Sequence, residues 1–103
     1  MKDAPIPPED THTMAEVRFG VDAVDAALVE LLATRFGYMR AAARIKPSRD
    51  AVRDEARKAE VIAQVRAKAV ELDIPVKLVT ELWEQLVEAS ISYELQHWDQ
   101  RSV

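Results

Sequence analysis

The sequence predicts an all-α fold with three helices, one long and two shorter. Apolar residues recur at spacings of three and four over most of the chain, as on one face of an amphipathic helix. Capping residues and prolines divide this pattern into three segments, and no segment shows the strict alternation or the turn pairs of a β-hairpin. At 103 residues, of which 49% are hydrophobic, the chain has the size of a single domain.

The first predicted helix covers residues 13–46. Thr13 and Glu16 form a capping box at its start, and Pro47 ends it. A helix of this length spans about 50 Å, whereas a compact chain of this size has a radius of gyration of about 13 Å. We therefore expect a second copy of the chain to cover it in a homodimer. Its apolar seam, in heptad spacing, consists of Val17, Val21, Val24, Leu28, Leu31, Arg35, Tyr38, Ala42 and Ile45.

The remaining segments follow from similar signals. Residues 1–12 hold three of the five prolines and are expected to form an extended or disordered tail, which leaves residues 13–100 as the helical domain. Asp54 is the expected N-cap of a second helix that ends near Leu72, and Pro75 opens a third that ends near Gln100. The predicted apolar positions are Ile62, Val65, Ala69 and Leu72 in the second helix, and Val79, Trp83, Leu86, Ser90, Tyr93 and His97 in the third.

Composition excludes several classes of function. A net charge of −4 argues against nucleic acid as the main partner. Without cysteine, and with two histidines that do not form a ligand-spaced pair, neither a metal site nor a cofactor is expected. No apolar run is long enough to span a membrane and the start lacks the apolar core of a signal peptide, so we expect a cytoplasmic protein without a membrane partner.

Polar residues at apolar positions are the candidate site. Arg35 lies on the seam of the long helix, and Lys46 follows on the same face about 16 Å further along the axis. Arg35 could snorkel or pair with a glutamate, or the two cations could hold a small dianion between them. Arg18 lies about 25 Å before Arg35, so it could join the same site only from a second chain. Ser90 and Glu94 similarly interrupt the third helix, in line with Leu86.

This pattern resembles the all-helical chorismate mutases and their relatives, the isochorismate–pyruvate lyases. The resemblance runs from about residue 14 to residue 98. It rests on Arg18, Arg35 and Lys46, on Val52-Arg53-Asp54 leading to Arg57, and on Ser90 with Glu94. It implies three helices per chain in an intertwined homodimer with shared active sites and a small-molecule substrate, chorismate or isochorismate.

The resemblance also implies roles for these residues. Arg18 of the partner chain and Arg35 would bind the substrate carboxylates, with help from Ser90. Lys46 and Glu94 would face the ether oxygen of the enolpyruvyl group from opposite sides, which with Arg35 makes them the expected catalytic residues. Asp54 and Arg57 would line the pocket beside the second helix.

Three positions bear on the choice of reaction. The family usually has glutamine where this chain has Glu94, although some mutases have glutamate. At the position of Lys58 the mutases usually have a glutamate, which binds the ring hydroxyl of chorismate. The lyases lack that glutamate. His97-Trp98 is more similar to the lyases. We expect a chorismate mutase first and an isochorismate–pyruvate lyase giving salicylate and pyruvate second. The third alternative is a non-catalytic helical dimer whose charges set the pairing register.

Overall fold

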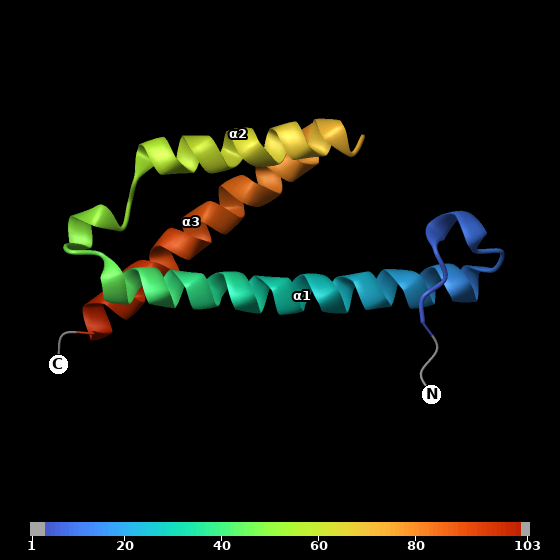
Figure 1. Cartoon of the computed structure of the whole chain (residues 1–103), viewed down its shortest axis with the longest axis horizontal. Coiled ribbons are helices and arrows are strands. Elements are labelled where there is room, and N and C mark those ends of the chain that lie inside the picture. Colours follow the sequence, from blue (N-terminus) through green and yellow to red (C-terminus); the bar gives the residue numbers. More distant parts are fainter. Residues whose placement is uncertain (1–3, 102–103) are drawn as a thin grey trace. The chain divides into compact units, whose positions relative to one another are not determined.

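The structure, a computed structural model, describes residues 4–101, and every regular element among them is helical (Figure 1). Helix α1 covers Met14–Ile45, α2 Glu55–Glu71 and α3 Val76–Gln100. Two short 3-10 helices lie at Pro8–Asp10 and Arg49–Ala51. The predicted all-α fold with one long and two shorter helices is confirmed, and the three predicted helices differ from the observed ones by a residue or so at their ends.

The chain divides into two compact units, and the division falls within α1, after Arg35. In the N-terminal unit the predicted capping box forms. The amide of Glu16 donates to Thr13 Oγ1, and Glu16 Oε1 accepts from the amides of Thr13 and His12 at 3.1 and 2.7 Å. Both partners of the box are thereby satisfied, and α1 has a fixed start. Of the tail predicted over residues 1–12, the first three lie outside the described residues, and the rest contains the 3-10 helix Pro8–Asp10.

The predicted seam of α1 is largely exposed in the single chain. Val21, Val24, Leu28 and Leu31 each expose half or more of their surface. Such a row of aliphatic side chains needs a covering surface, since an apolar patch of this kind marks an interaction site. The exposure supports the homodimer, which stays a prediction.

The core of the C-terminal unit lies between α2, α3 and the connection that precedes α2. It is centred on Val52, Val87 and Ile91. Partly buried apolar residues surround these three: Val61, Ile62, Trp83, Leu95 and Trp98. The predicted apolar face of α3 is incomplete: all six predicted positions are half-buried or buried, but α3 also buries Val87 and Ile91, which the prediction did not include. On α2, Ala69 is buried as predicted but Leu72 is exposed.

The ends of α2 are fixed by local hydrogen bonds. Asp54 caps the start as predicted, since its Oδ1 accepts from the amide of Arg57 at 3.0 Å. At the other end Asp73 has a φ of 56°, and the amides of Asp73 and Ile74 donate to the carbonyls of Val70 and Ala69. This pair of bonds is a Schellman motif, which ends α2 and turns the chain towards α3.

Candidate active site

A partly buried ion pair joins the end of α1 to α3. Lys46 follows the last residue of α1, and its Nζ lies 2.7 Å from Oε2 of Glu94 and donates to the carbonyl of Val52 at 3.3 Å. Glu94 is only 3% exposed, whereas the Lys46 side chain is 29% exposed. Two residues that the sequence assigned to one site are thus brought together across 48 positions of the chain.

Glu94 has an unfulfilled hydrogen-bonding capacity. Its Oε2 is buried, and the contact with Lys46 is an ion pair without the direction of a hydrogen bond, so no donor among residues 4–101 serves this oxygen. Buried polar atoms almost always have a partner, and an exception points to a missing ligand or water. A substrate that carries a donor would supply the missing hydrogen bond.

Ser90 lies one turn before Glu94 and is also 3% exposed. Its Oγ donates to the carbonyl of Leu86 at 2.7 Å, which is the back-bond that a helical serine commonly makes. The structure therefore gathers three of the predicted site residues, Lys46, Ser90 and Glu94, within the C-terminal unit.

Asp54 and Arg57 are placed at the start of α2, where the sequence expected them. Asp54 uses Oδ1 for the helix cap. Arg57 is exposed and its Nη1 donates to Glu60 at 3.0 Å on the same helix. Both side chains thus have structural partners in the single chain, and a role in binding would require Arg57 to leave its exposed ion pair, which is worth little in water.

Lys58 belongs to a charge network that joins α2 to α3. Its Nζ lies 2.9 Å from Glu88 and 3.1 Å from Glu84. Arg53 clamps Glu88 with both terminal nitrogens, at 2.7 and 3.2 Å. These hydrogen bonds, from Arg53 first and Lys58 second, lower the pKa of Glu88 to about 2, and Glu88 in turn raises the pKa of Lys58. Lys58 is thus a paired cation where the mutases usually have a glutamate.

The two remaining predicted residues belong to the N-terminal unit. Arg18 is exposed on α1, in the turn after the capping box, and Arg35 is half-buried at the end of that unit. Arg35 has an interaction of its own and is not an unpaired cation. Whether both bind substrate together with Lys46 stays a prediction.

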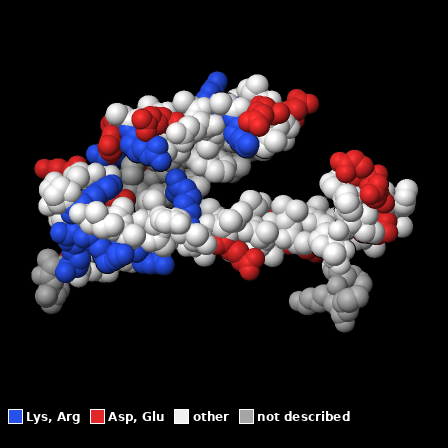
Figure 2. Space-filling model, viewed as in Figure 1, with Lys and Arg blue, Asp and Glu red and all other residues white. Residues whose placement is uncertain are grey.

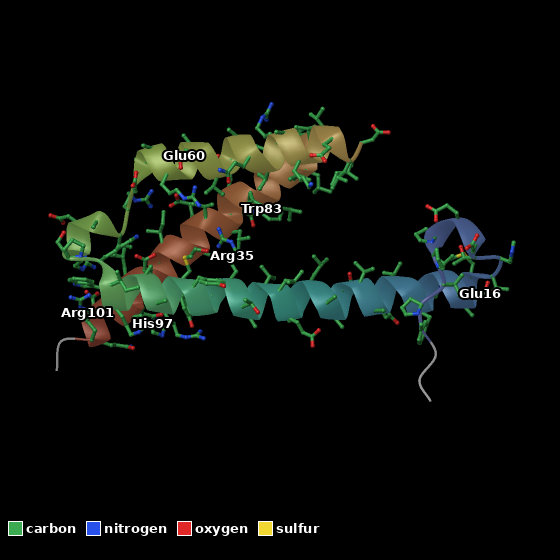
Figure 3. All side chains as sticks on the ribbon, in the orientation of Figure 1. Glu16, Arg35, Glu60, Trp83, His97 and Arg101 are labelled. Atoms are coloured by element: carbon green, nitrogen blue, oxygen red, sulfur yellow. The ribbon has the colours of Figure 1, made fainter. Side chains whose placement is uncertain are left out.

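Sequence reasoning missed the contribution of Arg101 (Figure 3). Its Nη1 donates to the carbonyls of Ala43 and Lys46, at 2.6 and 3.1 Å, and its guanidinium carbon lies 3.4 Å from the ring centroid of Trp98. These carbonyls are left unpaired at the end of α1, and a cation that caps them also complements the helix dipole. Because Arg101 holds the backbone of Lys46 itself, it positions the predicted catalytic lysine. The sequence offered one signal of this role, a basic residue just beyond the predicted end of the third helix.

No group of side chains suited to hold a metal ion occurs among residues 4–101. No helix in this part of the chain is long and apolar enough to cross a membrane.

Comparison with known proteins matches residues 17–95 to the family Chorismate mutase type II. The isochorismate pyruvate lyase of Pseudomonas aeruginosa is 29% identical over 93 residues, which cover 90% of this chain and 92% of the relative. The family match includes most of α1, all of α2, and α3 as far as Leu95, so it contains Lys46, Ser90 and Glu94. The chain belongs to the chorismate mutase type II family.

Proposed function

We propose that this protein is an enzyme that breaks the enolpyruvyl ether bond of isochorismate, giving salicylate and pyruvate, in a homodimer with shared sites. The observation that carries the proposal is the ion pair of Lys46 with the buried Glu94 beside the buried Ser90. A lysine that is fixed against a buried carboxylate is an expensive arrangement to keep for stability alone, because an apolar pair of similar volume would do as well.

The chemistry asks for what these residues offer. In a pericyclic reaction the enzyme holds the reactive conformer and stabilises the charge that grows on the ether oxygen as its bond to carbon breaks. The ammonium group of Lys46 is the donor for that oxygen, and its contact with Glu94 holds the ammonium group in place in the site. Arg35, and Arg18 from the partner chain, bind the two carboxylates of the substrate. Ser90, Asp54 and Arg57 complete the pocket. No cofactor or metal takes part.

Two observations favour isochorismate over chorismate. The relative that matches nearly the full length is an isochorismate pyruvate lyase. Lys58, at the position where mutases usually have the glutamate for the ring hydroxyl of chorismate, is held between Glu84 and Glu88. The second candidate is chorismate mutase, which forms prephenate from chorismate, and the family match supports it.

The test supplies the purified protein with each substrate separately. Isochorismate loss with equal amounts of salicylate and pyruvate, at a higher kcat/KM than for chorismate loss, is the expected result. Faster conversion of chorismate to prephenate would reverse the order of the two candidates. Activity on neither substrate would favour the non-catalytic helical dimer.

A further inference from the structure

The C-terminal unit contains a cavity of about 400 Å³, and none of the residues proposed to bind the substrate lines it. Three small residues of α1 are among those that line it, Gly37, Ala41 and Ala43. Four side chains with basic groups line the rest, Arg40 and Arg44 from α1, His97 from α3, and Arg101 from the segment after α3. Figure 2 shows the Lys and Arg side chains gathered around this end of α1.

The arginines of this cavity differ from most other cations of the C-terminal unit. Seven lysines and arginines of that unit lie within 3.5 Å of a carboxylate: Lys46, Arg49, Arg53, Arg57, Lys58, Lys68 and Lys77. Arg40, Arg44 and Arg101 have no carboxylate partner among residues 4–101, although the chain has 18 acidic residues and a net charge of −4. An unneutralised cluster of this kind in an acidic chain favours an anion that comes from outside.

Two of the guanidinium groups are already held in place. Arg40 Nη1 donates to the hydroxyl of Tyr93 at 2.7 Å. A Cβ at position 37 would lie 3.3 Å from Arg40 Nη2, so the glycine leaves room for this side chain. Arg101 is held by the carbonyls at the end of α1. Since a guanidinium has five N–H donors, both arginines keep donors for a ligand.

His97 adds a fourth basic group with a defined orientation. Its Nδ1 lies 3.0 Å from the carbonyl oxygen of Tyr93, and because a carbonyl can only accept, Nδ1 carries a proton. Its ring lies against that of Tyr93, with 4.4 Å between the ring centroids. Tyr93 thus connects Arg40 to His97 and keeps both beside the cavity.

The helix dipole alone does not explain the cluster. The end of α1 carries about half a negative charge, which one arginine is enough to offset. Arg101, which binds the end carbonyls directly, already does this. Arg40 and Arg44 therefore bring two further positive charges that no carboxylate among residues 4–101 neutralises.

The cavity also differs from the predicted site by its face of α1. Four of its five α1 residues, at positions 37, 40, 41 and 44, lie on average about 120° around the helix axis from Tyr38, Ala42 and Ile45, which belong to the apolar seam. We propose that this cavity is a second ligand site, which binds a small oxyanion with two negative charges, a phosphate or a dicarboxylate. Guanidinium groups bind both through paired, charge-assisted hydrogen bonds.

The test observes the arginine side chains directly. The Nε–Hε resonances of the ¹⁵N-labelled full chain are followed during titration with inorganic phosphate or with malonate, each compared with sodium chloride at equal ionic strength. We expect saturable shifts of the Arg40 and Arg44 resonances with one or both dianions and none with chloride. A response to phosphate alone or to malonate alone identifies the source of the anion.

Variants provide the controls. Arg44→Gln should weaken dianion binding about tenfold or more, as expected for the loss of a charge-assisted pair, and Arg40→Gln should act similarly. Arg66→Gln is the matched control, because Arg66 also lacks a carboxylate partner but donates to Thr80 away from the cavity. Since Arg44 is exposed and has no ion pair with any described residue, its replacement should leave the fold intact. The proposal is overturned if neither dianion shifts these resonances beyond chloride, or if Arg66→Gln weakens binding equally. It is also overturned if Arg35→Gln abolishes binding while Arg44→Gln does not, since the anion would then occupy the substrate site.

Discussion

Replacing Lys46 with alanine should harm both stability and catalysis, and the two effects can be separated. The position of Lys46 beyond the last turn of α1 would by itself predict a harmless substitution for the fold. The contact with Glu94 changes that expectation, because Lys46→Ala leaves a carboxylate that is 3% exposed without its cation. Removing one partner of a buried pair costs about 3–5 kcal/mol. Since the Lys46 side chain is 29% exposed and water can partly replace it, we expect about 3 kcal/mol.

The catalytic loss has a different origin. Without its ammonium group the site lacks the donor for the ether oxygen, and loss of such a donor lowers the rate about 100-fold or more. Adding Glu94→Gln should separate the two effects. The double variant Lys46→Ala with Glu94→Gln buries a neutral amide instead of a charge, so most of the lost stability should return. The lost rate should not return, because the ammonium group is still absent.

The assays are urea unfolding followed by circular dichroism and initial rates at saturating substrate. Unfolding must be compared at one protein concentration, since the stability of a dimer depends on it. A shift of about 3 kcal/mol corresponds to about 1–3 M urea for a chain of this size. If Lys46→Ala unfolds at the same urea concentration as the wild type, the pair of Lys46 and Glu94 contributes nothing to stability. A double variant with near wild-type rates would show that Lys46 serves only to neutralise Glu94.

Three further predictions concern other parts of the molecule. Mixing inactive Arg18→Ala and Arg35→Ala chains should restore activity through hybrid dimers, and no recovery after verified subunit exchange would contradict a shared site. Exchanging Lys58→Glu together with Glu84→Lys reverses the pair with Glu84 and removes the pair with Glu88, which keeps its hydrogen bonds from Arg53. We expect a higher ratio of mutase to lyase activity; an unchanged ratio would mean that position 58 does not face the substrate ring. The pKa of Glu88 is about 2 in the folded chain, below the ordinary value of 4.5 for a glutamate. The stabilisation from ionised Glu88 is therefore complete above pH 4.5 and is lost as the pH falls towards 2. Glu88→Gln should therefore flatten the pH dependence of unfolding in that range, and an equally steep dependence would show that the network is not formed in solution.

The helix boundaries could be predicted because their signals are local. The capping box at Thr13, the cap at Asp54 and the prolines at positions 47 and 75 act within a few residues of themselves. Such signals depend on backbone geometry and on hydrogen bonds that need no tertiary context. The pair of Lys46 and Glu94 could be expected only by combining helical spacing with the family resemblance.

Contacts between distant segments could not be predicted in the same way. Val52 lies in the short connection before α2, where an apolar residue carries little information, yet it is 3% exposed at the centre of the core. Arg101 reaches carbonyls that lie more than 50 residues earlier in the chain. Lys58 could be recognised as unusual for a mutase, but its two glutamate partners follow only from the packing of α2 on α3.

The arrangement of α3 shows why core and site are linked in this protein. Val87 and Ile91 belong to the core, while Ser90 and Glu94 are buried on the neighbouring stripe of the same helix. Residues three apart on a helix share nearly the same face, so Ser90 and Glu94 cannot turn without moving the core side chains Val87 and Ile91. Val52 strengthens this link, because its side chain is in the core and its carbonyl accepts from Lys46. A smaller residue at position 52 should therefore affect catalysis as well as stability, since it loosens the backbone group that fixes the lysine.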